Sequence, residues 1–310
     1  MAAGLTSVRI GTRSSPLARA QTTWVTNALR EAYASLDIEV VVISTSGDRS
    51  QATNVPDPDW GSGVFVKELE IALLHEEIDL AVHSLKDLPP VQVADLTLVA
   101  IPVRDDPTDV LVTLDGRGLG DLGPGARVGT SSARRAAFLR APRPDLQFVA
   151  IRGNVETRLR KLGEGQYDAI VLARAGLRRL DLEVACVVLE PELVPPAPGQ
   201  GALAIQARAG DRAVAELAEP LHDPATASAV RAERRLMIDL NGGCGLPFGA
   251  LGTPRPDGEL HLLGGLTREP GELRIADAVG RLDAPEDLAD RLAERLRAPA
   301  NGEQRRAALA

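Results

Sequence analysis

The segment VRIGTRSSPLARA, residues 8–20, begins as an apolar strand and runs directly into a helix start. Ser15 is an N-cap residue type, and Pro16 follows it where the first helical residue is expected. We therefore expect a strand at Val8 to Gly11 and a helix from residue 16 to about residue 34. A strand that passes into a helix is the repeating unit of an α/β fold.

The same alternation continues along the chain. The run IEVVVIS at 38–44 predicts a strand, 64–78 a helix and 80–85 another strand. A second series has helices expected from Ser132 and Val155. Its expected strands cover residues 109–112, 127–129, 148–151 and 169–173. Unbroken apolar strands joined by helices predict parallel sheets with both faces covered.

Proline-bearing segments at 101–107 and 191–198 flank the second series, and an apolar strand resumes at Ala202. The chain thus crosses twice between the two series, which predicts one α/β domain inserted in another. A helix at 227–240, two hairpin-like strands and a last helix then predict a small α+β domain. The expected domains are an N-terminal one of residues 1–102 with 200–220, an inserted one of 103–199 and a C-terminal one of 221–310.

Composition excludes several classes of protein. Of the 310 residues, 44% are apolar and 25% are charged, which is close to the average for globular domains. No apolar run approaches the roughly 18 residues of a membrane-spanning helix, and the N-terminus lacks the basic start and apolar stretch of a secretory signal. We therefore expect a cytoplasmic protein that binds no membrane.

The charge distribution is more informative than the total. A net charge of −8 argues against general nucleic-acid binding. Residues 126–180, however, hold eleven Arg, one Lys and four acidic residues, a net charge of +8 that leaves −16 for the remainder. A positive segment in an acidic protein predicts a small anionic ligand.

Three expected strand-to-helix junctions carry hydroxyl or basic side chains. They are Thr12 to Ser15, Gly129 to Arg135, and Arg152 to Asn154 ahead of Arg158. Helix N-termini attract anions, and arginine grips a carboxylate through two hydrogen bonds. The simpler interpretation of any one junction is a serine cap beside an exposed arginine that contributes little to stability. Three such junctions together favour anion binding at the carboxyl ends of the strands.

A fourth strand end carries a lysine and an aspartate. The strand at 80–85 leads into Lys86 and Asp87, and Pro89 stiffens the segment. A surface ion pair is the alternative interpretation of these two charges. His83 is more simply a buried, hydrogen-bonded histidine than a base.

The two cysteines are too few for a disulfide framework and lack the spacing of a zinc site, so no metal is expected. Cys186 lies in the strand-like ACVV at 185–188 and is expected in the core. Cys244 lies in NGGCG at 241–245, where glycines permit close approach of a ligand. A buried structural thiol is the default interpretation of Cys244.

Several of these segments occur in the same order in porphobilinogen deaminases, also called hydroxymethylbilane synthases. The matching segments are TRSSPLA at 12–18, FVKELE at 65–70, HSLKDLP at 83–89, GTSSARR at 129–135, RGN at 152–154, GQGA at 199–202 and GGC at 242–244. The chain resembles this family over nearly its whole length. The resemblance implies two periplasmic-binding-protein-like doubly wound α/β domains plus a small α+β C-terminal domain.

The resemblance also implies an activity. Members of this family are cytoplasmic, usually monomeric transferases of tetrapyrrole synthesis. They join four porphobilinogen molecules head to tail into hydroxymethylbilane and release four ammonia molecules. The family carries a covalent dipyrromethane cofactor on a cysteine, which matches Cys244 here.

The resemblance assigns roles to residues of this sequence. Asp87 matches the catalytic carboxylate, which stabilises the cationic azafulvene formed when ammonia leaves. Besides Cys244, the positions that match cofactor-binding residues are Ser84, Lys86, Thr130, Ser131, Ser132, Arg134, Arg135 and Gly153. The positions that match substrate-binding residues are Arg13, Ser15, Phe65, Arg152, Arg158, Arg179 and Gln200.

One segment departs from the family, because WGSG at 60–63 places Ser62 where a lysine is usual. Two alternatives from other classes remain. A non-catalytic anion-binding receptor of periplasmic-binding-protein type would share the α/β domains, but it would need a secretory signal and gives no reason for a third domain with a cysteine. The effector domain of a transcription regulator would need a DNA-binding helix-turn-helix.

Overall fold

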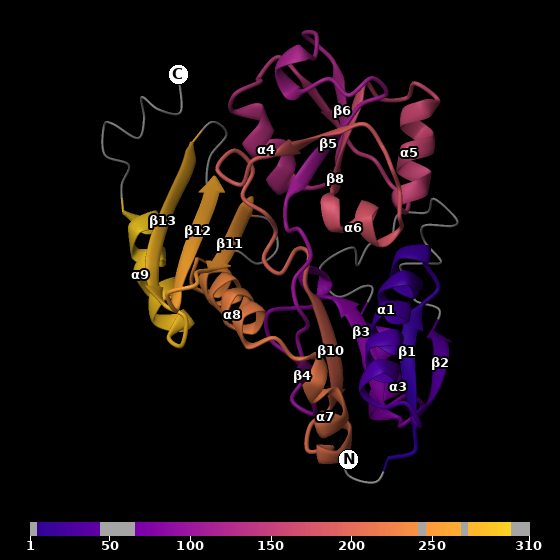
Figure 1. Ribbon diagram of the computed structural model, residues 1–310. Coiled ribbons are helices and arrows are strands. Elements are labelled where there is room, and N and C mark those ends of the chain that lie inside the picture. The colour runs from indigo at the N-terminus through magenta and orange to yellow at the C-terminus, as the bar shows by residue number, and fades with distance from the viewer. Residues whose placement is uncertain (1–4, 44–65, 241–245, 268–271, 299–310) are drawn as a thin grey trace. The chain divides into compact units, whose positions relative to one another are not determined.

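The computed structural model describes residues 5–43, 66–240, 246–267 and 272–298 (Figure 1). The chain forms two compact units. Unit 1 comprises Met1–Asp105 and Gly201–Ala227, and unit 2 comprises Asp106–Gln200 and Ser228–Ala310. The finer division into three domains, with boundaries near residues 102, 199 and 220, stays a prediction.

Unit 1 contains a five-stranded sheet in the order β2-β1-β3-β10-β4. Its strands are β1 Ser7–Arg13, β2 Asp37–Ile43, β3 Leu80–Ser84, β4 Leu96–Ala100 and β10 Leu203–Arg208. β1 is parallel to β2 and β3, but β10 is antiparallel to β3 and β4. The expectation of a wholly parallel sheet is therefore wrong. The chain re-enters unit 1 beside Ser84, at the carboxyl end of β3, and so it must run back along that strand.

Helices cover both faces of this sheet. They are α1 Pro16–Ala32, α3 Lys67–Leu74 and α7 Arg212–Ala218, with short 3-10 turns η1 Leu85–Asp87 and η3 Glu219–Leu221. α1 and α7 share one apolar cluster with β1 and β3, and α3 packs in a separate cluster with Ala81. The predicted cap is confirmed, since Ser15 Oγ accepts a hydrogen bond from Ala18 N at 3.3 Å and Pro16 follows at the first helical position.

Unit 2 contains a second mixed sheet, in the order β7-β6-β8-β5-β9. Its strands are β5 Asp109–Val112, β6 Arg127–Gly129, β7 Gln147–Val149, β8 Ala169–Ala173 and β9 Cys186–Leu189. Its helices are α4 Ala133–Arg140, α5 Val155–Gly163 and α6 Arg174–Arg179, with a turn η2 at Leu119–Asp121. β6 is parallel to β7 and β8, while β5 is antiparallel to β8 and β9. The helices expected from Ser132 and Val155 are present, and Ser132 and Asn154 cap them.

The C-terminal part of unit 2 is a three-stranded antiparallel sheet with two helices. Its elements are β11 Phe248–Pro254, β12 Glu259–Thr267, β13 Leu273–Arg281, α8 Pro224–Asp239 and α9 Pro285–Arg297. Leu236, Leu262 and Leu292 belong to one buried cluster that joins these helices to the sheet. The expected fold class, α/β sheets plus a small α+β portion, is confirmed.

Glycines let this small sheet pack closely against the rest of unit 2. A Cβ atom on Gly249 would lie 2.1 Å from the Pro195 carbonyl oxygen, and one on Gly265 would lie 3.0 Å from the Phe138 ring. The buried Glu233 carboxylate also accepts hydrogen bonds from Gly199 N at 2.7 Å and Gly252 N at 2.8 Å. These contacts attach the C-terminal sheet to the segment that precedes Gln200.

Two further expectations concern the position of Cys186 and the presence of membrane-spanning helices. The expectation that Cys186 lies in the core is wrong, because it begins β9, which is an edge strand, and its side chain is exposed. Among the described residues, no helix is long and apolar enough to cross a membrane.

Candidate active site

The strand–turn segment at the end of β3 presents two charged side chains. Ser84 ends the strand, and its Oγ accepts a hydrogen bond from the buried Gln21 Nε2 at 2.8 Å. Leu85 N donates to Ala202 O at 3.0 Å, which anchors the start of η1. The next two residues, Lys86 and Asp87, are exposed and half-buried respectively. The turn therefore holds a lysine and a carboxylate at the carboxyl edge of the unit 1 sheet.

Two other predicted residues lie at the same edge. β1 and β3 are parallel neighbours with Gly11 opposite Ala81, so Arg13 at the end of β1 is level with His83. Ser15 follows at the N-terminus of α1. The topology thus places Arg13 and Ser15 at the sheet edge that also carries Lys86 and Asp87.

His83 is the buried, hydrogen-bonded residue that the simpler interpretation predicts. Its Nε2 lies 3.1 Å from Gln206 Oε1 on β10. The pKa of His83 is lowered to about 4, mainly by burial and also by the positive charge of Arg13, although the hydrogen bond to Gln206 opposes the shift. His83 is therefore neutral near pH 7 and faces the interior of the unit.

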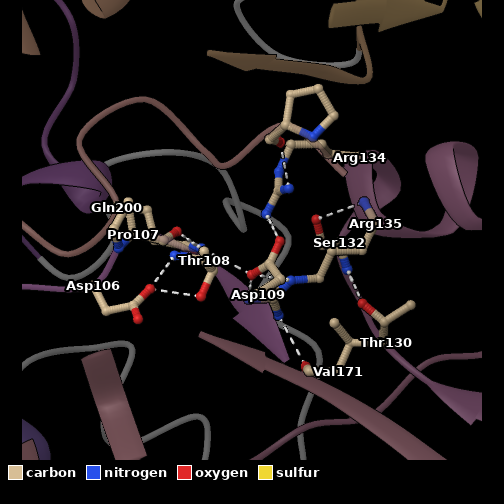
Figure 2. A network of polar contacts seen from close by, with 11 residues as sticks. Asp106, Pro107, Thr108, Asp109, Thr130, Ser132, Arg134, Arg135, Val171 and Gln200 are labelled. Atoms are coloured by element: carbon tan, nitrogen blue, oxygen red, sulfur yellow. Dashed lines mark hydrogen bonds and ion pairs between the residues drawn. The ribbon is translucent and has the colours of Figure 1, made fainter. Parts of the chain in front are cut away.

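A network of charges around Asp109 forms a deeply buried polar cluster in unit 2 (Figure 2). Asp109 begins β5, and its Oδ2 lies 2.8 Å from Arg134 Nη2 while its Oδ1 lies 2.7 Å from Arg135 Nη2. Gln200 Nε2 donates to the same Oδ1 at 2.8 Å. Burial by itself would raise the pKa of Asp109, but the two guanidinium groups outweigh it and hold the pKa far below its usual range.

The remaining donors of the two arginines reach backbone carbonyls. Arg134 Nη1 donates to Pro195 O at 2.6 Å, and Arg135 Nη1 donates to Val171 O at 3.0 Å. Both residues are only 7% exposed. The simpler interpretation of exposed arginines is therefore wrong for Arg134 and Arg135. Asp109, which the sequence motifs did not include, lets both cations be buried.

The cluster nevertheless keeps a surplus of positive charge. Arg158 on α5 is half-buried, and its pKa falls to about 10 because of burial and then because of the nearby charge of Arg135. Asp109 therefore binds two of the guanidinium groups, and the third, on Arg158, lies close enough to Arg135 to feel its charge. Buried cations in excess of their counterions favour binding of an added anion. The residues present thus fit a ligand that brings carboxylates of its own.

The predicted hydroxyl residues build the junction that carries these arginines. Thr130 Oγ1 accepts a hydrogen bond from Ser132 N at 3.2 Å, and Ser132 Oγ accepts one from Arg135 N at 3.3 Å. Ser131 Oγ donates to Ile151 O at 2.8 Å. Because Ile151 immediately precedes the RGN segment, this bond ties the junction after β6 to the junction after β7.

The second junction has its own local constraints. Gly153 has a φ of +111°, and a Cβ atom there would lie 2.8 Å from Thr157 Cβ. Arg158 Nε donates to Gly153 O at 2.8 Å, and Lys161 Nζ donates to Arg152 O at 3.1 Å. A residue with a side chain would therefore disturb the position of Arg158. Arg152 itself is half-buried.

The other predicted residues of unit 2 have different surroundings. Gln200 is 1% exposed and also donates to Pro107 O at 2.8 Å, so it is bound to the interior of the unit. Arg179 is the last residue of α6, which follows β8. An open pocket of about 460 Å³ lies beside that helix, lined by Arg174, Leu177, Arg178, Leu182, Glu183, Val184, Ala185 and Cys186.

Phe65, Ser62 and the proposed cofactor cysteine, Cys244, lie outside the described residues. Their parts in the site stay predictions. The chain on both sides of residues 241–245 is anchored, because Leu240 belongs to the C-terminal core and Leu246 packs against it.

Comparisons with known proteins identify the family. The model "Porphobilinogen deaminase, dipyromethane cofactor binding domain" matches residues 8–216, and the C-terminal domain model of the same family matches residues 227–298. A porphobilinogen deaminase of Roseiflexus castenholzii is 47% identical over 94% of this chain and 95% of its own length. One from Thermus thermophilus is 46% identical over 91% of this chain and 92% of its own.

Solved structures show more distant likenesses. The BvgS VFT2 domain of Bordetella pertussis is 21% identical with a TM-score of 0.42, covering 70% of this chain and 87% of its own. The alkanesulfonate-binding protein SsuA of Xanthomonas axonopodis is 15% identical with a TM-score of 0.37, covering 78% and 77%. The family models and the relatives together cover most of the sequence, so the chain belongs to the porphobilinogen deaminase family.

Proposed function

We propose that the protein is a hydroxymethylbilane synthase, which joins four porphobilinogen molecules head to tail and releases four ammonia molecules. The observation that carries the proposal is the buried pair of Arg134 and Arg135 on the carboxylate of Asp109, with the further positive charge of Arg158 close to Arg135. It lies within the residues matched by the dipyrromethane-binding domain of the family. Membership in this enzyme family argues against the non-catalytic receptor.

The arginine cluster suits a substrate that accumulates negative charge. Each porphobilinogen brings two carboxylates, so every added unit increases the charge that the protein has to hold. Hydrogen bonds between a guanidinium group and a carboxylate are strong and directional. Asp109 and the carbonyls of Pro195 and Val171 hold two of the guanidinium groups in fixed positions before any ligand binds. Little ordering of side chains is then required on binding.

We assign the covalent attachment to Cys244. When bound there, dipyrromethane supplies the pyrrole end to which substrate units are joined. Thr130, Ser131 and Ser132 orient the helix start that carries the arginines.

Asp87 is the proposed catalytic residue. Its carboxylate is half-buried on a turn with a fixed backbone, which suits stabilisation of the positive charge that develops on a pyrrole ring as ammonia leaves. It can also accept a hydrogen bond from a pyrrole N–H. Lys86, on the same turn, is an exposed cation whose charge suits a substrate carboxylate.

Intact mass of the purified protein under denaturing conditions tests the proposal. We expect a mass excess in the wild type that is absent from Cys244→Ser and retained in Cys186→Ser. Cys186 is a stringent control because its thiol is exposed and would react with any adventitious electrophile. An unmodified wild-type protein that forms hydroxymethylbilane at full rate would refute the attachment, and a protein unable to consume porphobilinogen would refute the activity.

The proposal extends to a monomeric, cytoplasmic enzyme, as the family resemblance implies. Light scattering coupled to size exclusion should then give a mass near the chain mass of 32.8 kDa. Twice that value would contradict the monomer.

A further inference from the structure

A chain of hydrogen-bonded amides, centred on the buried Gln206, connects to the turn that carries Asp87. Gln206 on β10 is 0% exposed, and its Oε1 lies 3.1 Å from His83 Nε2. Its Nε2 donates to Gln92 Oε1 at 3.0 Å and to Glu70 Oε1 at 3.2 Å. Gln92 Nε2 in turn donates to Pro89 O at 2.8 Å. The chain therefore joins the strand before the catalytic turn to the residue just after it.

The direction of every hydrogen bond in this chain is determined. Glu70 and Gln92 offer oxygens to Gln206, so its amide nitrogen must face them and its oxygen must face His83. An amide oxygen can only accept, so His83 donates from Nε2. Gln92 presents its nitrogen to a carbonyl, which agrees with the same order. A buried network with one consistent order of donors and acceptors is rigid.

The position of Asp87 depends on this rigidity. Within the described part of the chain, no hydrogen bond or ion pair holds the Asp87 carboxylate itself, so the backbone of the turn sets its place. That backbone is tied to β10 at its start through Leu85 N, which donates to Ala202 O. After the turn, the tie to β10 runs from Pro89 through Gln92 to Gln206.

We propose that Gln206 is a positioning residue for the condensation reaction, acting through Gln92 and the backbone of residues 85–89 on Asp87. The inference rests on the proposed function, because it assigns Gln206 to the placement of the catalytic carboxylate. Gln206 has no place in substrate binding, since its side chain is fully buried against β3 and α3.

Gln206→Met tests the proposal, because it keeps the length of the side chain and removes the amide. Misplacement of a reacting group by a fraction of an ångström to 1 Å typically costs up to about 100-fold in rate. We expect kcat per cofactor-loaded molecule to fall about 10- to 100-fold while KM changes by less than about threefold. Hydrogen exchange at the amides of Leu85 and Leu88 should become at least about tenfold faster.

Two further variants keep the test decisive. Ile205→Val is the matched control, because this neighbouring β10 side chain is also buried but pairs with Val82 and contacts the other face of the sheet. It should destabilise unit 1 while leaving kcat and the exchange of the turn unchanged. Gln92→Met, at a partly exposed position, removes the hydrogen bond to Pro89 O. It should lower kcat about three- to tenfold. This variant replaces Gln206→Met if the latter does not fold.

The outcomes are separable. A Gln206→Met enzyme with kcat within twofold of wild type and unchanged exchange at Leu85 and Leu88 would overturn the inference. An equal loss of kcat in Ile205→Val would also overturn it, since the effect would then reflect stability alone. If the wild-type protein has no activity, the proposed function is refuted. Faster hydrogen exchange of the turn in Gln206→Met would then still show that Gln206 orders the turn.

Discussion

The turn of unit 1 and the arginine cluster of unit 2 hold charged groups in opposite ways. Hydrogen bonds from amide and imidazole groups hold the turn, namely those of Gln21, His83, Gln92 and Gln206, and the carboxylate of Asp87 remains half-buried. In unit 2 the cations themselves are buried, and an internal carboxylate, Asp109, binds two of them. The backbone of the turn is enough to position a half-buried carboxylate such as that of Asp87. Buried guanidinium groups, by contrast, need a negatively charged partner within the fold.

The two arrangements differ in what their loss should cost. Removing one partner of a buried ion pair leaves an uncompensated charge, at about 3–5 kcal/mol. Removing one partner of a neutral buried hydrogen bond costs about 1–3 kcal/mol. Substitutions in the ion pairs of unit 2 are therefore expected to lower the free energy of unfolding first. Substitutions around the turn of unit 1 are expected to lower the turnover rate first.

The largest expected effect is on the rate, in Asp87→Asn. Asparagine keeps the size of the side chain but cannot balance a cation or exchange a proton with the leaving amine. We expect turnover to fall about 100- to 10,000-fold, with a melting temperature close to that of the wild type. Turnover per folded molecule and melting temperature should be measured on one preparation. A lowered melting temperature with turnover within about tenfold of wild type would identify Asp87 as a structural partner of Lys86 instead.

Asp109→Asn should have the largest effect on stability. It leaves Arg134 and Arg135 buried without a counterion, so the free energy of unfolding should fall by about 3–5 kcal/mol. Urea unfolding measures this directly. Combining Asp109→Asn with Arg134→Met removes one charge of each sign, and the double variant should lose less than the sum of the two single losses by at least about 1 kcal/mol. Additive losses would show that the ion pair contributes nothing to the fold.

Arg152→Leu should separate binding from stability within unit 2. Arg152 is half-buried, so its removal should change the free energy of unfolding by less than about 1 kcal/mol. Loss of one charge-assisted hydrogen bond to a carboxylate should weaken binding by about 1.5–3 kcal/mol, seen as a raised KM or as stalled intermediates in intact-mass spectra. Arg135→Leu, the buried comparison, should lower stability as well. Wild-type kinetics in Arg152→Leu would remove this residue from the site.

The last expected effect is a pH dependence located in unit 1, which appears only below neutral pH. The pKa of His83 is lowered from 6.5 to about 4, so the unfolded chain binds a proton before the folded chain does. The contribution of neutral His83 to the free energy of unfolding is complete above pH 6.5. It is lost as the pH falls towards 4, at up to about 1.4 kcal/mol per pH unit. Asp109 remains ionised through this window because its pKa lies below the usual range.

His83→Gln, which keeps a donor for Gln206, is the control for this prediction. Urea unfolding at pH 7 and pH 5 should show a smaller difference in this variant than in the wild type. An equal difference would place the acid sensitivity outside His83.

The local features of the molecule could be predicted from the sequence. Strands at 109–112, 127–129 and 169–173 lie where the apolar runs predict them, and Ser15, Ser132 and Asn154 cap the expected helices. Strand runs and helix caps depend on residues a few positions apart, so a single segment contains the information. The order of segments also indicated the family, and with it the carboxylate at Asp87 and the cysteine at Cys244 as predicted site residues.

The partners of those residues were decided only by the tertiary structure. Asp109 is 25 and 26 positions from Arg134 and Arg135, and Gln206 is 123 positions from His83, so no local pattern joins them. The direction of β10 follows from where the chain re-enters unit 1, and the exposure of Cys186 follows from the edge position of β9. Burial and charge pairing depend on which segments the fold brings into contact, and this is why the sequence alone showed which residues carry charge but not which of those charges are compensated.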